Sequence, residues 1–299
     1  MSVGRSRQGR LTGRRSGRPG SGRRVERRLQ HRPSRCSAVI RGVVLDVDGT
    51  VVRGNEPVPG APAAVDRLRA AGRDPCFCSN NPTKGPRAYA ERLGAAGIDA
   101  APDEVVTAAD STVAYLREHH ANDDLYVVGE DGLVERLVAG GLSTADEPAA
   151  ADAGVVSIDR SFDYDDLTRA LWALGDGTPY VGTDPDRVIP APDAFVPGSG
   201  AVINAVSGVL DHDPDAVLGK PSPTARELVL DRIGHPPEEC LVVGDRLDTD
   251  VALGADAGMT TAVVLTGVTD RDDVADSPYD PDYVLADLDE LDRVFKVEA

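Results

Sequence analysis

The stretch "VVLDVDGTVV", residues 43–52, decides the fold that we expect for this chain. It begins as a continuous apolar run and then places two carboxylates, Asp46 and Asp48, two positions apart before Gly49 and Thr50. A buried strand has no use for two acids, and a turn needs only one. An apolar run of this kind predicts a strand of a parallel sheet that is covered on both faces. Its polar end predicts chemistry rather than structure.

Strand and helix patterns alternate along the rest of the chain. Short apolar strands are predicted at "DPCFCSNN" (74–81), "ECLVVGD" (239–245) and "TTAVVLTG" (260–267), with amphipathic helices at 61–73, 86–98, 109–120 and 250–259. This order predicts an α/β fold, a doubly wound parallel sheet of the Rossmann-like type. In such a sheet, sites lie beyond the carboxyl ends of the strands.

A second series of strand–helix units occupies about residues 121–214. We expect it to form an inserted α/β cap domain, with residues 41–120 and 215–299 forming the catalytic core. Trp172, in the predicted helix "LTRALWALG", is expected to lie in the core of the insertion.

Charge is distributed very unevenly. Residues 1–40 hold twelve Arg and one acid, and the remaining 259 residues carry 20 basic and 49 acidic side chains, a formal charge of −29. Lysine occurs only at positions 84, 220 and 296. Such an acidic, Lys-poor surface resembles the cytoplasmic proteins of salt-loving microbes, in which concentrated salt screens self-repulsion. No apolar run is long enough for a membrane span, so we expect a soluble, cytoplasmic protein.

The first forty residues are rich in Arg, Gly and Ser and offer almost nothing to bury, which predicts disorder. They lack the apolar segment of a secretion signal. Three alternatives remain open: an inert tail, a start codon assigned too early, and an arm that binds nucleic acid through phosphates. We favour the first two.

Four polar clusters follow apolar strands or open helices. They are Asp46-Val47-Asp48-Gly49-Thr50, Ser79-Asn80-Asn81, Gly219-Lys220-Pro221, and Gly244-Asp245 with Asp250. In this order the set resembles the haloacid dehalogenase superfamily of phosphatases, and the likeness runs from about residue 41 to the end.

The details "SNN", "GKPSP", "VGDRLDTD" and "TDPDRVIPAPDAFVPGSGA" resemble the NagD-like, 4-nitrophenyl phosphatase branch of that superfamily, subfamily IIA. That branch usually carries Asn where Asp184 stands and Ala where Ser199 stands. Its large α/β cap matches the predicted insertion.

The chemistry of phosphate esters suggests a role for each side chain. A phosphate dianion repels an attacking carboxylate, so its charge has to be neutralised first. Asp46 suits the nucleophile that forms an aspartyl-phosphate. Asp48 suits the acid that protonates the leaving alkoxide and the base that then takes a proton from water. Lys220 suits a fixed positive charge beside the phosphoryl group.

An all-oxygen setting of this kind suits Mg²⁺. By the resemblance, its protein ligands are the Asp46 carboxylate, the Asp48 backbone carbonyl and the Asp245 carboxylate, while Asp250 is expected to hydrogen-bond a metal-bound water. The Ser79 hydroxyl and the Asn80 amide are expected to bind phosphoryl oxygens.

Structural alternatives stay open at these positions. Asp46 and Asp48 suit a turn or a helix cap, Ser79 and Asn80 suit a cap for the following helix, and Lys220 suits a solvated surface charge.

The expected function is Mg²⁺-dependent hydrolysis of a small phosphate monoester, such as a sugar phosphate, phosphoglycolate or nucleotide, with 4-nitrophenyl phosphate as an artificial substrate. A phosphomutase with the same intermediate is an alternative, and so is a non-catalytic protein that binds a phosphorylated metabolite or nucleic acid. Carbon–halogen hydrolysis is disfavoured because it needs neither an acid at position 48 nor a metal cluster.

The cap is expected to close over the site and to select the leaving group. Its loop around Thr183, Asp184, Pro185 and Asp186 is expected to contact the substrate. Caps of this branch often pair, which implies a homodimer formed through the cap.

Overall fold

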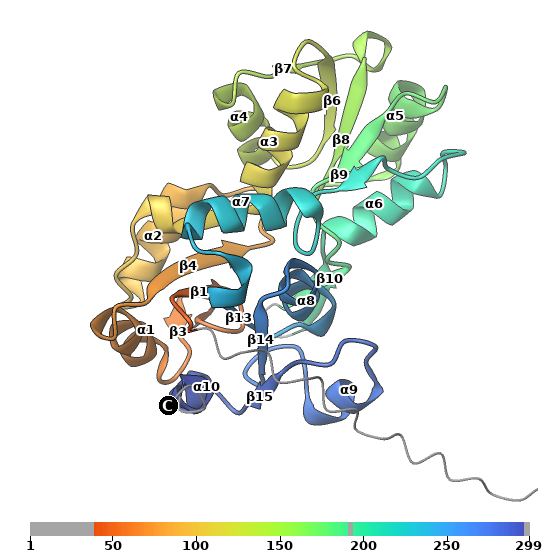
Figure 1. Cartoon of the computed structure of the whole chain (residues 1–299). Coiled ribbons are helices and arrows are strands. Elements are labelled where there is room, and N and C mark those ends of the chain that lie inside the picture. Colours follow the sequence, from red (N-terminus) through yellow and green to blue (C-terminus); the bar gives the residue numbers. More distant parts are fainter. Residues whose placement is uncertain (1–38, 191–193, 296–299) are drawn as a thin grey trace, which may run out of the picture. The chain divides into compact units, whose positions relative to one another are not determined.

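The computed structural model describes residues 39–190 and 194–295. Two parallel sheets organise this part of the chain, and helices cover both faces of each sheet (Figure 1). This arrangement confirms the predicted α/β fold with Rossmann-like parallel sheets. The predicted Arg-rich tail, up to residue 38, lies outside the described residues.

The larger sheet has six parallel strands in the order β15-β14-β13-β1-β4-β5. Its strands are β1 (Gly42–Asp46), β4 (Asp74–Ser79), β5 (Val105–Thr107), β13 (Cys240–Gly244), β14 (Thr260–Val264) and β15 (Tyr283–Leu285). β1 pairs directly with β13 on one side and with β4 on the other. The three strands that carry predicted site residues are therefore neighbours at the centre of the sheet.

Ten α-helices surround the two sheets in the described part of the chain. They are α1 (Ala61–Ala70), α2 (Pro86–Ala95), α3 (Ala108–His119), α4 (Asp131–Ala139), α5 (Tyr164–Leu174), α6 (Ser199–Ser207), α7 (Pro223–Ile233), α8 (Ala252–Ala257), α9 (Arg271–Asp276) and α10 (Asp292–Phe295).

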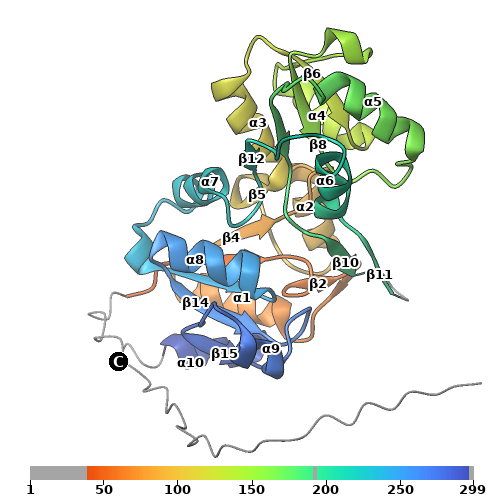
Figure 2. The ribbon, with the colours of Figure 1, turned by 90° about the vertical axis from the view of Figure 1, so that its right-hand side faces the viewer.

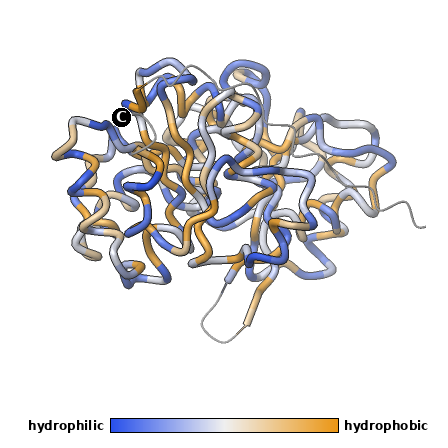
Figure 3. Tube along the Cα trace, turned by 60° about the horizontal axis from the view of Figure 1, so that its bottom comes forward, coloured by the Kyte–Doolittle hydropathy of each residue, from blue (hydrophilic) through white to orange (hydrophobic). Residues whose placement is uncertain are grey.

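Alternate residues of β1 pack into two different hydrophobic cores, one on each face of the sheet. Val43 and Leu45 pack against α1 and α2 on one face, and Val44 packs against α7 on the other. All three side chains are almost completely buried, and burial of each stabilises the fold by about 1.5–3 kcal/mol. Figure 3 shows hydrophobic segments along interior strands and hydrophilic ones along outer loops. A strand buried on both faces must be apolar along its length, so its first polar side chain stands where it ends.

The second sheet has five parallel strands in the order β12-β9-β8-β6-β7. Its strands are β6 (Asp124–Val128), β7 (Ser143–Thr144), β8 (Ala153–Val156), β9 (Tyr180–Gly182) and β12 (Ala216–Val217). One face packs against α5 and α6 and the other against α3 and α4 (Figure 2). These strands span residues 124–217, close to the segment 121–214 that we expect to form the cap.

Trp172 does not lie in the core of the second sheet, and the prediction for this residue was wrong. The inner face of α5 is formed by Ala170, Ala173 and Leu174, which are buried, whereas the Trp172 side chain is 69% exposed. Residues 170, 173 and 174 follow the helical period, and Trp172 falls between them on the outside.

Shorter elements complete the described chain. They are the hairpin strands β2 (Val52–Arg53) with β3 (Glu56–Pro57) and β10 (Val188–Pro190) with β11 (Phe195–Pro197), the 3₁₀ turns at Pro102–Glu104, Pro148–Ala150, Pro237–Glu239 and Leu288–Leu291, and the π-helical turn at Leu247–Val251. Within the described residues, none of the helices combines the length and the apolar character that a membrane crossing requires.

Candidate active site

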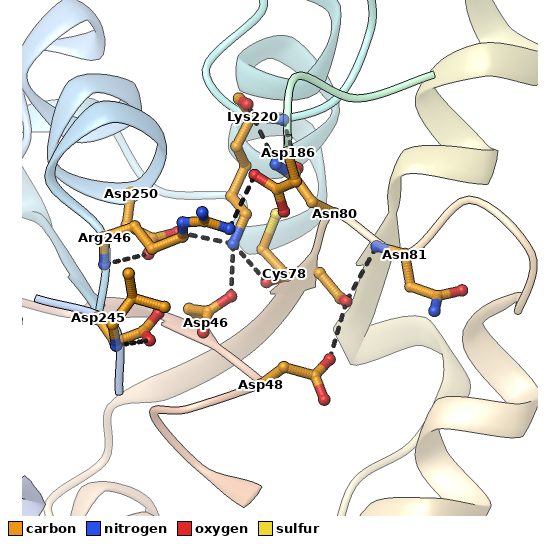
Figure 4. Close-up of polar contacts among 12 residues, drawn as sticks. Asp46, Asp48, Cys78, Asn80, Asn81, Asp186, Lys220, Asp245, Arg246 and Asp250 are labelled. Atoms are coloured by element: carbon orange, nitrogen blue, oxygen red, sulfur yellow. Dashed lines mark hydrogen bonds and ion pairs between the residues drawn. The ribbon is translucent and has the colours of Figure 1, made fainter. Parts of the chain in front are cut away.

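Three neighbouring strands bring the predicted polar residues to one edge of the larger sheet. Asp46 is the last residue of β1, Ser79 is the last residue of β4, and Asp245 directly follows β13. Because the strands are parallel, their carboxyl ends meet at the same edge, where α/β proteins hold their ligands. Figure 4 shows Asp46, Asp245, Asp250 and Lys220 gathered at this edge.

Lys220 is the charged centre of the cluster. Its Nζ donates to Asp46 Oδ1 at 2.6 Å, to Asp250 Oδ1 at 2.7 Å and to the Cys78 carbonyl at 2.9 Å, so all three ammonium protons are used. The side chain is 3% exposed. Burial alone would lower the pKa of Lys220, but Asp250 and Asp46 outweigh burial and hold this pKa well above its usual value. Lys220 is therefore a permanent buried cation and not a surface charge.

Asn80 fixes the loop that carries this lysine. The backbone N–H of Lys220 donates to Asn80 Oδ1 at 2.7 Å, and Asn80 Nδ2 donates back to the Lys220 carbonyl at 3.3 Å. The side chain of Asn80 thus positions Lys220, a contact that the sequence analysis did not foresee.

Among the described residues, Asp46, Asp245 and Asp250 each offer a carboxylate oxygen within 4.8 Å of the others. All three side chains are buried, and one lysine does not balance their charges. Burial raises the pKa of Asp46 well above its usual value; Lys220 partly reverses this rise, and Asp250 and Asp245 add to it. Burial, followed by the charge of Asp250, raises the pKa of Asp245 to about 7.

This cluster fits a hard divalent cation. Asp46 Oδ2 is a buried oxygen with no hydrogen-bond partner in the described part of the chain. Three buried carboxylates with an unpaired oxygen form an incomplete, negatively charged donor set made only of oxygen, which is the kind that Mg²⁺ accepts. This donor set supports Asp46 and Asp245 as metal ligands. The carboxylate of Asp250 lies within the same distance of both.

Two glycines make room for Asp245. A Cβ on Gly267 would collide with the Asp245 carboxylate, and a Cβ on Gly49 would lie 2.9 Å from its Cγ. Gly49 also has a φ of +98°, which favours glycine. The glycine of the sequence "DVDGT" therefore serves both the turn after β1 and the approach of Asp245.

Asp48 lies on the other side of Asp46, beside Ser79. Its Oδ1 accepts from Arg92 Nη2 at 2.7 Å, its Oδ2 accepts from the Tyr89 hydroxyl at 3.2 Å, and Ser79 Oγ lies 3.5 Å from the same Oδ2. Sequence reasoning missed Tyr89 and Arg92. Their spacing of three residues puts them on one face of α2, but no signal in the sequence tells that this face meets Asp48.

A cavity of about 710 Å³ opens over these residues. It is lined by residues at the strand ends of the larger sheet and by residues that follow β9 of the second sheet. Its walls include Asp46, Asp48, Ser79 and Lys220 from one side and Asp184 and Asp186 from the other. Of the four predicted loop residues, Asp184 and Asp186 line the cavity. Thr183 and Pro185 are not among the described residues that line it.

Asp186 joins the predicted cap to the edge of the larger sheet. Its Oδ1 lies 3.1 Å from Nη1 of Arg246, the residue after Asp245, and both side chains are largely buried. Arg246 is a third site residue that sequence reasoning missed, although the "VGDRLDTD" segment contains it.

Asp184 is 2% exposed, and Thr183 Oγ1 donates to its Oδ2 at 3.1 Å. Burial, followed by the charge of Asp186, raises the pKa of Asp184 to about 8. A protonated Asp184 has a hydrogen-bond donor and an acceptor, as an asparagine side chain would.

Comparisons with known proteins agree with this geometry. The family model described as haloacid dehalogenase-like hydrolase matches residues 43–143, and the HAD-hydrolase-like model matches residues 217–291. The sugar-phosphatase AraL of Bacillus subtilis is 33% identical over 253 residues, which are 85% of this chain and 92% of that protein.

Two solved structures show the same similarity. The p-nitrophenyl phosphatase from Archaeoglobus fulgidus superimposes with a TM-score of 0.80 at 33% identity, covering 86% of this chain and 100% of that chain. NagD from E. coli superimposes with a TM-score of 0.76 at 29% identity, covering 85% of this chain and 98% of that chain.

Proposed function

This chain belongs to the haloacid dehalogenase superfamily, in its NagD-like branch, and on that premise we propose that it hydrolyses sugar phosphates through a phosphorylated aspartate, with Mg²⁺. Like these relatives, it is a phosphatase that acts on small phosphate esters. Sugar phosphates are proposed because AraL is named a sugar phosphatase, and 4-nitrophenyl phosphate is proposed as an artificial substrate because of the A. fulgidus protein.

Asp46 is the proposed nucleophile. Its Oδ1 is held by Lys220, while its Oδ2 has no hydrogen-bond partner among the described residues. That oxygen attacks phosphorus, the bond from phosphorus to the ester oxygen breaks, and an aspartyl-phosphate forms. Water then attacks the aspartyl-phosphate, which releases phosphate and restores Asp46. The positive charge of Lys220 offsets the negative charge of the phosphoryl oxygens through these steps, and the Ser79 hydroxyl is the proposed donor to one of them.

Asp48 is the proposed acid and base. Protonated, it gives a proton to the leaving alkoxide; ionised, it takes a proton from the water that hydrolyses the intermediate. Its place beside Ser79 puts it next to the oxygens that Ser79 would bind.

Asp46, Asp245 and the Asp48 carbonyl are the proposed holders of Mg²⁺, with Asp250 beside them. When bound, the cation supplies charge neutralisation that lets a carboxylate approach a phosphate dianion.

We propose residues 121–214 as the cap, with the loop at Asp184 and Asp186 contacting the leaving group. A cytoplasmic location is proposed from the acidic composition, and a homodimer through the cap is proposed from the exposed outer face of α5.

The observation that carries this proposal is the buried contact of Lys220 with Asp46 and Asp250, 2.6 and 2.7 Å long, at the end of β1. The test is hydrolysis of 4-nitrophenyl phosphate by the wild type and by Asp46→Asn, with EDTA and with added Mg²⁺. We expect Asp46→Asn to lose at least about 10³-fold in kcat, because removal of a covalent nucleophile leaves only binding and electrostatics. EDTA should abolish wild-type activity and Mg²⁺ should restore it. Full activity of Asp46→Asn would rule out the mechanism.

A further inference from the structure

Two side chains that contact Asp48 have no role in the proposed mechanism. Helix α2 directs two polar side chains, Tyr89 and Arg92, at the carboxylate of Asp48, and together they engage both of its oxygens. Asp48 is otherwise poorly enclosed, because its side chain is 46% exposed.

Tyr89 links Asp48 to the end of β4. It is fully buried, and its hydroxyl accepts from Ser79 Oγ at 2.9 Å while donating to Asp48 Oδ2 at 3.2 Å. The phenol therefore ties the proposed phosphate-binding hydroxyl and the proposed acid to one buried anchor.

Arg92 links Asp48 to the hairpin of β2 and β3. Its Nη2 donates to Asp48 Oδ1 at 2.7 Å, and its Nε donates to the Gly54 carbonyl at 3.0 Å. Only 17% of its side chain is exposed, and its guanidinium carbon lies 5.6 Å from the centre of the Tyr89 ring. The guanidinium is thus held by its own contacts and supplies a fixed partner.

A half-exposed aspartate on a loop samples several rotamers in water. Two anchored donors on one rigid helix select a single orientation, and catalytic rates depend steeply on such orientation. We propose that Tyr89 and Arg92 are positioning residues that hold Asp48 beside Ser79, where it delivers a proton to the ester oxygen of the substrate. This inference rests on the proposed role of Asp48 as the acid.

The consequence depends on the leaving group. An alkoxide needs a proton as it leaves, whereas 4-nitrophenolate is stable without one. Misplacing Asp48 should therefore slow the cleavage of alkyl esters and largely spare 4-nitrophenyl phosphate. A general loss of packing would slow both substrates equally.

The experiment compares kcat/KM for benzyl phosphate and 4-nitrophenyl phosphate, which share an aromatic group and differ in the basicity of the leaving oxygen. The variants are Tyr89→Phe and Arg92→Met, with Asp48→Asn as the reference. Arg87→Met is the matched control, because Arg87 lies on the same helix and pairs with the exposed Glu91. The ratio of the two rates is measured in one preparation, so a fraction of misfolded protein cancels.

We expect Asp48→Asn to lower the benzyl phosphate rate by about 10²-fold or more relative to 4-nitrophenyl phosphate. Tyr89→Phe and Arg92→Met should each lower this ratio by roughly 10-fold, Arg92→Lys should restore part of it, and Arg87→Met should leave it unchanged. If Asp48→Asn changes the ratio and the two α2 variants do not, the positioning inference is overturned while the proposed function stands. If Asp48→Asn leaves the ratio unchanged, the acid role itself is wrong and the inference fails with it.

Discussion

Lys220 shows how a single residue organises the site. Three carboxylates crowd into a buried space, and the one ammonium group contacts two of them, Asp46 and Asp250. Leaving a buried charge unpaired costs roughly 3–5 kcal/mol, so we expect the removal of this ammonium group to destabilise the fold. The rarity of lysine in the chain helped to predict the site, because one of its three lysines lies within the carboxylate cluster.

We expect the stability of the fold to depend on pH through the side chain of Asp184. Its pKa is raised to about 8 in the folded protein, whereas an unfolded chain gives Asp about 3.9. A raised carboxyl pKa contributes stability that is complete below about pH 4 and is lost as the pH rises to about 8.

We therefore predict that Asp184→Asn makes the free energy of unfolding less dependent on pH. From pH 5 to pH 9 the free energy of unfolding of the variant should increase, relative to that of the wild type, by on the order of a few kcal/mol. The reason is that Asn has no proton to lose. Urea denaturation of both proteins at the two pH values measures this gain. An equal stability difference at both pH values would contradict the raised pKa.

At the scale of elements, the strand ends were predictable from the sequence and the helix faces were not. Asp46, Ser79 and Asp245 stand where apolar runs stop, and parallel pairing of β1, β4 and β13 brings any such residues together. The period of α2 places Tyr89 and Arg92 on one face, but which neighbour that face meets is decided by tertiary packing. Trp172 was misplaced for a different reason, because the helical period of α5 already puts it opposite the buried residues Ala170, Ala173 and Leu174.

The outer face of α5 is the apolar surface that supports the proposed dimer. Tyr164 and Trp172 are 81% and 69% exposed, and Leu171 is 40% exposed. If two copies of α5 pair antiparallel about Thr168, Tyr164 of each copy lies against Trp172 of the other, which is the self-complementarity that a two-fold dimer requires. Aromatic side chains are enriched in such interfaces.

We predict that Trp172→Asp converts a dimer to a monomer, because it places a charge in an apolar contact. Light scattering after size exclusion, at micromolar to millimolar protein, gives the mass. Val138→Asp is the control, since Val138 is 55% exposed on α4, which covers the opposite face of the sheet. A wild-type monomer, or a dimer that persists in Trp172→Asp, would contradict this interface.

At the scale of the whole molecule, the charge balance predicts a dependence on salt. Residues 41–299 carry a formal charge of −29, and screening weakens repulsion beyond a Debye length of about 10 Å at 0.1 M and about 3 Å at 1 M. We predict that the unfolding midpoint rises by roughly 5 °C or more between 0.1 M and 2 M KCl. Chloride is used because sulfate strengthens apolar burial in any protein. A midpoint that does not change with KCl would contradict the proposed adaptation to salt.

The most direct measurement is the position of phosphate on the enzyme during turnover. The wild type is mixed with 4-nitrophenyl phosphate and Mg²⁺, quenched in acid within milliseconds, digested and sequenced by mass spectrometry. We predict one phosphoryl group on Asp46, present in the wild type and lacking in Asp46→Asn. Phosphate on a different side chain, or hydrolysis that proceeds at the wild-type rate in Asp46→Asn, would contradict the account.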